Sequence, residues 1–116
     1  MKGIEVEETE TGKFSLWTVK KNVGKTPTIY NITLTSANTE YPQALPDHTK
    51  KLTFQCRTAN DIRFAFVAGK VATPTAPYGT IKSDGAYDEK DLDLVSKTLY
   101  LACGSAGKVV EIVCYT

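Results

Sequence analysis

Histidine is almost absent from this sequence, since His48 is its only residue of that type. Nucleophilic and acid–base catalysis usually needs a histidine or two carboxylates that face each other across a cleft. His48 lies in a turn at residues 46–49, and no glycine-rich phosphate loop or Ser/His/Asp set is visible. The sequence therefore predicts a protein that is not an enzyme, with no catalytic residue and no cofactor.

Cysteine is also sparse, with only Cys56, Cys103 and Cys114 and no Cys-x-x-Cys pair. Each of the three lies in a run of alternating polar and apolar residues, as small buried hydrophobic side chains do. An odd number of cysteines does not favour a disulfide framework, and the spacing does not suit a zinc site. We therefore expect three reduced thiols, a reducing compartment and no metal.

Long apolar runs and a strong net charge are both missing. No segment approaches the roughly 18 apolar residues of a membrane span, and the first residues lack the apolar core of a secretory signal. The formal net charge is +1 and the pI is about 7.7, whereas a nucleic-acid-binding protein is expected to be strongly basic. These absences predict a soluble protein that binds neither membrane nor nucleic acid.

The charge is unevenly distributed along the 116 residues. Residues 1–12 hold four glutamates against one lysine, a net charge of −3, and residues 83–93 hold five acids against one lysine, a net charge of −4. Residues 13–82 have a net charge of +7. The acidic segments are either solvated loops or docking segments for basic surfaces, in the same subunit or in another one. The second segment lacks the spaced pattern of a calcium-binding hand.

Residues 50–67 have the clearest pattern in the chain. Apolar residues alternate with polar ones on both sides of turn formers at 58–61, which predicts two strands joined as a β-hairpin with an aromatic inner face. We expect the hairpin to lie at the centre of a sheet, and a shared core to include Phe54, Phe64, Phe66, Leu101 and Ile112.

Other segments are also β-prone, and none has the period of an amphipathic helix. Residues 104–107 are expected to form a hairpin loop before a central closing strand, and the prolines of residues 36–46 predict a linker there. The expected fold is all-β, a single-domain β-sandwich of jelly-roll type, with an open Greek-key barrel as the alternative. The further strands are predicted at residues 13–19, 28–34, 80–82, 97–103 and 108–115.

Two parts of the chain are expected to differ in structure. Residues 1–12 are polar and end in glycine, which predicts an extended acidic arm that becomes ordered against a partner. Residues 13–116 are expected to form the sandwich. Residues 68–79 contain two glycines and two prolines, which predict an irregular crossing loop that carries Tyr78.

Several motifs resemble a type of small protein that tailed bacteriophages and prophages encode among their virion structural genes. The resemblance covers roughly residues 29–116, and residues 1–12 lie outside it. It implies a non-enzymatic virion part that is bound to the capsid surface or to a fibre or tail component. The motifs are YPQALP at residues 41–46, RFAF at 63–66 leading to GKV at 69–71, PTAPY at 74–78 and LYLA at 99–102.

Two functions remain open on this basis. In the first, the protein decorates the capsid, binds the major capsid protein or another virion protein, forms a homo-oligomer such as a trimer, and assembles in the host cytoplasm. In the second, it is a fibre or tail module for a host surface or carbohydrate receptor, with Trp17, Tyr78 and Tyr87 as stacking residues. Few aromatic residues favour the first function. The expected contact residues are Ile4, Glu5, Val6, Glu7, Glu8, Glu10, Trp17 and Tyr78.

Overall fold

A computed structural model describes residues 25–116. This part of the chain contains eight strands and no helix, so it has no helix that could cross a membrane. The expected arm at residues 1–12 and the expected strand at residues 13–19 lie outside the described residues. The strands are β1 (Thr28–Leu34), β2 (Tyr41–Ala44), β3 (Lys51–Cys56), β4 (Ile62–Ala65), β5 (Gly79–Ile81), β6 (Ala86–Glu89), β7 (Thr98–Cys103) and β8 (Lys108–Tyr115).

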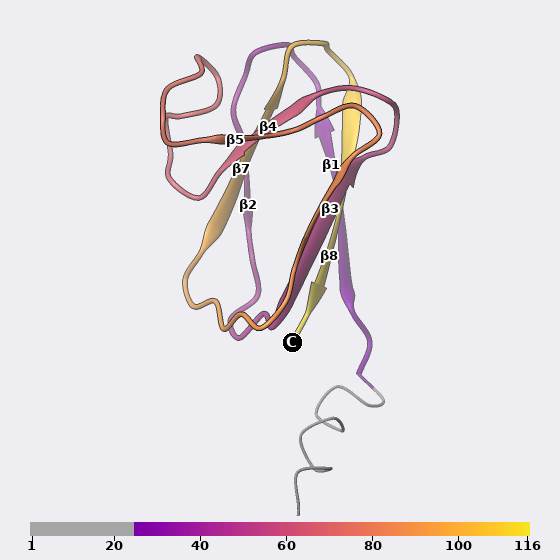
Figure 1. The fold of residues 1–116 in the computed structure, drawn as a ribbon, viewed down its shortest axis with the longest axis vertical. Helices are drawn as coiled ribbons and strands as arrows, with labels where there is room; N and C mark the ends of the chain where they lie inside the picture. Colours follow the sequence, from indigo (N-terminus) through magenta and orange to yellow (C-terminus); the bar gives the residue numbers. More distant parts are fainter. Residues whose placement is uncertain (1–24) are drawn as a thin grey trace, which may run out of the picture.

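The strands form two antiparallel sheets of four strands each (Figure 1). One has the order β1-β8-β3-β6 and is called here the β1 sheet; the other has the order β2-β7-β4-β5 and is called the β2 sheet. The pairs β1–β8, β2–β7, β3–β6 and β4–β5 are nested, as in a long hairpin that has been rolled up. The predicted all-β class is confirmed, and so is the central position of the closing strand β8.

The core lies between the two sheets. Along β8, every second side chain is buried, which gives the inward-facing set Val110, Ile112 and Cys114. Strands β3 and β7 contribute their inward residues in the same way, because side chains alternate between the two faces of a strand. The largest buried cluster contains Leu34, Leu45, Leu52, Phe54, Ile62, Ile81, Leu99, Leu101, Cys103, Val110, Ile112 and Cys114.

The predicted hairpin at residues 50–67 is wrong. Its two strands exist as β3 and β4, but β3 pairs with β6 and β8 whereas β4 pairs with β5 and β7. The turn between them carries the chain from one sheet to the other. The loop at 104–107 likewise joins β7 and β8, which lie in different sheets. Alternation fixes only which side chains face inward, and two facing sheets satisfy it as well as one hairpin does.

The expected core is right for Phe54, Leu101 and Ile112, which are fully buried, and wrong for Phe66. Phe66 is 38% exposed because β4 ends at Ala65 and the chain then leaves the sheet. Phe64 is half-buried and packs against the core.

The predicted linker at residues 36–46 contains a strand, β2, with Pro42 inside it. The Leu45 N–H donates to the Lys97 carbonyl at 3.0 Å, in the same register that pairs Pro42 with Tyr100. Because backbone groups alternate in direction along a strand, this bond directs the nitrogen of Pro42 away from β7. A missing N–H costs little on an outer edge, so this proline is compatible with an edge strand.

A turn at residues 83–84 leads into β6, which begins at Ala86. The strand is recruited by β3, whose Phe54 lies opposite Tyr87. Beyond β6 the backbone bends at Asp91, which has a φ of 60°, and Leu94 makes an isolated β-bridge with Thr49. Pairing with β3 determines the strand conformation of this segment, since its own side chains are mostly polar and give no clear strand pattern.

All three cysteines are free, with Cys103 and Cys114 buried and Cys56 partly buried. Burial raises the pKa of the Cys114 thiol, which disfavours the reactive thiolate. In the native protein we expect a thiol reagent to label Cys56 first and the other two only at the rate of unfolding. Mass spectrometry of time points checks this order. Rapid labelling of Cys114 in folded protein would contradict the assigned facing of β8.

Candidate interaction surfaces

The connection between β4 and β5 folds back over the outer face of the β2 sheet (Figure 1). Val71 in this connection is fully buried against Ala65 and Ala102, and Tyr100 packs beside them. Ala65 and Ala102 alternate along their strands with residues of the main core, so they face outward. The loop therefore makes a second, smaller core on the outside of this sheet.

Two charged side chains hold this loop in place. Arg63 on β4 donates from Nε to the Val71 carbonyl at 2.7 Å and from Nη2 to Asn38 Oδ1 at 2.7 Å. The carboxylate of Glu40 accepts from the Gly69 N–H at 3.0 and 3.2 Å. These bonds tie the loop to the connection between β1 and β2, and charge-assisted hydrogen bonds are stronger than neutral ones.

Apolar side chains are exposed at the base of this loop. Phe66 is 38%, Val67 56% and Tyr78 41% exposed. The pairing of Phe64 with Gly79 places Phe66 and Tyr78 at the two ends of the same loop. The sequence placed Tyr78 in this irregular loop without deciding between an exposed ring and one lying flat over the core edge, and its role in binding stays a prediction.

Aromatic rings connect this surface with the core. The ring of Phe66 lies edge-to-face on Phe64, with centroids 6.3 Å apart, and Phe64 lies 5.3 Å from both Phe54 and Tyr87. Edge-to-face pairs of this kind add to the stabilisation from burial alone. The exposed ring of Phe66 is thus the outer end of an aromatic cluster that begins in the main core.

Tyr87 is not an exposed stacking platform, contrary to the receptor-binding interpretation. It is half-buried and stacks on Phe54 with a centroid distance of 4.8 Å and an interplanar angle of 16°. Burial raises the pKa of its hydroxyl, and the nearby charge of Glu89 adds to the shift. Trp17, the second proposed stacking residue, lies outside the described residues.

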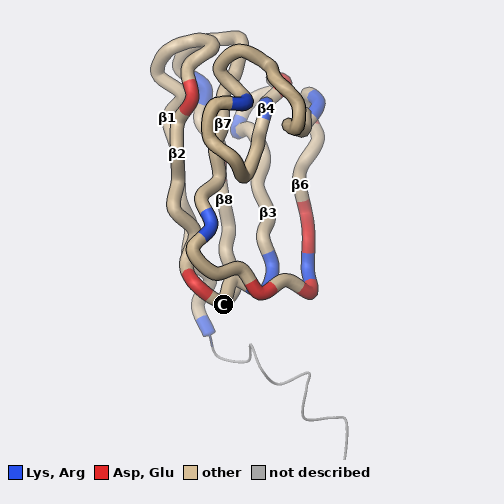
Figure 2. Tube along the Cα trace, turned by 90° about the vertical axis from the view of Figure 1, so that its left-hand side faces the viewer, with Lys and Arg blue, Asp and Glu red and all other residues tan. Residues whose placement is uncertain are grey.

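The end of the sandwich near the C-terminus carries a group of charged residues (Figure 2). His48 Nδ1 and Lys50 Nζ lie 3.0 and 3.1 Å from Asp93 Oδ1. The hydrogen bonds from His48 and then from Lys50 hold the pKa of the Asp93 carboxyl below its usual range. The stabilisation of the folded state by these contacts of the ionised Asp93 carboxylate is therefore present above the ordinary carboxyl pKa, and it is lost as the pH falls through the lowered pKa.

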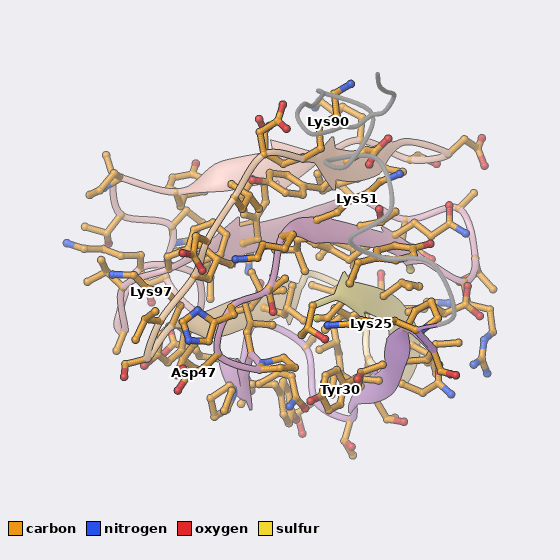
Figure 3. The ribbon with its side chains drawn as sticks, turned by 90° about the horizontal axis from the view of Figure 1, so that it is seen from below. Lys25, Tyr30, Asp47, Lys51, Lys90 and Lys97 are labelled. Carbon is orange, nitrogen blue, oxygen red and sulfur yellow. The ribbon has the colours of Figure 1, made fainter. Side chains whose placement is uncertain are left out.

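Figure 3 looks onto this end, where Asp47, Lys51, Lys90 and Lys97 come from different segments of the chain. Asp88 in the acidic segment accepts from the Thr53 hydroxyl at 3.1 Å and lies 3.9 Å from Lys51 Nζ. Like Asp93, Asp88 therefore lies beside a basic residue of its own subunit. Within residues 25–116, no three His, Cys, Asp or Glu side chains gather as they would around a metal ion.

The remaining expected contact residues cannot be placed on either surface. Ile4, Glu5, Val6, Glu7, Glu8 and Glu10 all lie outside the described residues. Sequence reasoning also missed the exposure of Phe66 and Val67. A signal was present for Val67, which alternation places on the opposite face from Phe64 and Phe66. None was present for Phe66, whose exposure follows from the end of β4 at Ala65.

Comparison with family models, curated proteins and solved structures finds no match for this chain.

Proposed function

We propose that this protein is a non-enzymatic structural protein of a bacteriophage virion, most simply a decoration protein that binds the major capsid protein and associates with itself. The observation that carries the proposal is the nested pairing of β1 with β8, β2 with β7, β3 with β6 and β4 with β5. We infer from it that the sandwich is a jelly roll, an architecture that is frequent in viral capsid proteins. The phage-like motifs support the same function.

The acidic arm is proposed as the attachment segment. Residues 1–12 have a net charge of −3 and few apolar side chains, only Met1, Ile4 and Val6. Ordering a backbone costs roughly 1–2 kcal/mol per residue, more than this apolar surface offsets. Basic groups on a capsid protein would supply the missing free energy by pairing with the four glutamates, so attachment should weaken with added salt.

Deleting residues 1–12 tests this function. We expect the truncated protein to keep its thermal unfolding transition, because the described core lies within residues 25–116, and to lose most of its incorporation into particles. Calorimetry measures the first property and the protein composition of purified particles measures the second. A full-length variant with Glu5, Glu7, Glu8 and Glu10 changed to Gln separates charge from chain length. Full incorporation of both variants would contradict attachment by the arm.

A second function is favoured by one observation, the exposure of Phe66 and Tyr78 at the base of one loop. Jelly rolls also occur in lectins, and exposed aromatic rings are suited to stacking against sugars. Imaging of intact particles distinguishes the two functions. Density for this protein over the capsid shell supports decoration, whereas density confined to a fibre tip supports receptor binding.

A further inference from the structure

Strand β1 is an edge strand of its sheet in the described part of the chain. It pairs with β8 on one side, and no strand of residues 25–116 pairs with its other side. At seven residues it is long for an edge strand, and it carries no charged side chain and no proline. Exposed strand edges with these properties readily pair with another strand.

The backbone groups that face outward on β1 follow from the bonds of β8. The Arg57 N–H donates to the Val109 carbonyl at 2.8 Å, so the backbone of Val109 points toward β3. Because direction alternates along a strand, Val110 and Ile112 point toward β1, where Ile32 and Tyr30 are their partners. The N–H and C=O groups of the intervening residues Ile29, Asn31 and Thr33 therefore point away from the sheet.

The other three edges of the described sheets are less suited to pairing. Pro42 removes an outward N–H from the edge strand β2, and β5 has only three residues. Strand β6 has four residues, two of which are Asp88 and Glu89. Short length, proline and charge are the usual devices that prevent association at an edge. Strand β1 has none of them.

We propose that the β1 edge binds the β1 edge of a second copy, so that the two β1 sheets join into one continuous antiparallel sheet. A twofold axis through Asn31 places Ile29 opposite Thr33 of the other copy, and Asn31 opposite its own equivalent. Each of these outward-facing pairs can exchange both backbone hydrogen bonds.

Side chains on this edge fit the same register. The strand is uncharged, so two identical edges meet without repulsion between like charges. On the outer face Ile29, which is 64% exposed, packs against the methyl group of Thr33 of the other copy. On the inner face the half-buried Tyr30 lies opposite Ile32. A second copy therefore provides hydrogen-bond partners for the outward backbone groups of β1 and apolar contacts for its side chains.

One pair of strands makes a small interface, so the dimer should form and dissociate with concentration. We expect sedimentation of the full-length protein to show a concentration-dependent dimer. Asn31→Lys places two ammonium groups opposite each other at the axis and should abolish the dimer. Gln55→Lys makes the same charge change on the outer face of β3, away from the edge, and should leave the dimer intact.

A second variant guards against misfolding as the cause. Asn31→Pro removes an N–H that points outward, so it spares the bonds between β1 and β8 and should keep the melting transition while losing the dimer. Dimers that persist in both Asn31 variants would overturn the proposal, as would a wild type that stays monomeric at millimolar concentration.

Hydrogen exchange of the Ile29, Asn31 and Thr33 amides identifies the occupant. Protection that rises with protein concentration supports the second copy, and protection independent of concentration assigns the edge to another segment of the same chain and overturns the proposal. These measurements use purified protein, so the dimer and the virion role can fail separately.

Discussion

Replacing Phe54 with alanine is expected to lower the free energy of unfolding by about 3–5 kcal/mol. The side chain is 1% exposed, stacks on Tyr87 and meets Phe64 edge-to-face. Its removal therefore loses the free energy of transferring the ring from water into the core and leaves a cavity between the sheets. Urea unfolding at equilibrium measures the change. The slope of the unfolding free energy against urea concentration should stay the same if the variant unfolds in two states.

The aromatic cluster supplies graded controls for this experiment. Phe64→Ala should cost less than Phe54→Ala because Phe64 is half-buried, and Phe66→Ala should cost least because its ring is 38% exposed. The alternating sequence predicted instead that all three rings are buried in one core. Equal losses for Phe54 and Phe66 would show that the loop base is buried in solution.

The second large effect is expected at Gly79 on β5. A Cβ atom at this position would lie 2.5 Å from two carbons of the Phe64 ring, closer than real Cβ contacts. The ring is held in place by Phe54 and Tyr87, so it cannot move away freely. Gly79→Ala should therefore destabilise the fold by about 1–3 kcal/mol, the usual cost of overpacking. Thermal and urea unfolding measure this change.

A double-mutant cycle assigns the cause. Combining Gly79→Ala with Phe64→Leu removes the clashing ring, so the loss for the pair should be smaller than the sum of the two single losses. Gly104→Ala is the matched control, because a Cβ there meets no atom within 4 Å and the residue has no positive φ. Strictly additive losses would show that Gly79 is needed for a reason other than its contact with Phe64.

Part of each candidate surface could be predicted from the sequence. The motif that carries Tyr78 has two prolines and a glycine nearby, which predict an exposed loop. Two hydrogen bonds that fix this loop could not be predicted, the one that Arg63 donates and the one that Glu40 accepts, because their partners are backbone groups of the loop itself. The position of β1 at an edge of the described sheet could not be predicted either, since an edge strand and a central strand can share one alternating pattern.

The sequence by itself determined the strand class, the inward faces of β3, β7 and β8, and the burial of Cys103 and Cys114. A period of two is a local property, so a few neighbouring residues suffice to specify it. The same information predicted Phe54, Leu101 and Ile112 as core residues, all of which are fully buried.

The tertiary structure alone decided which strands pair. Thr28 pairs with Cys114 from the far end of the chain, and Phe54 lies between Tyr87 and Ile112. Backbone hydrogen bonds are chemically alike for every residue, so a strand carries no local label for its partner. Which strands pair depends on how the inner faces of the two sheets fill one core. For this reason the two expected hairpins are connections between the sheets, and β1 is an edge strand of the described sheet.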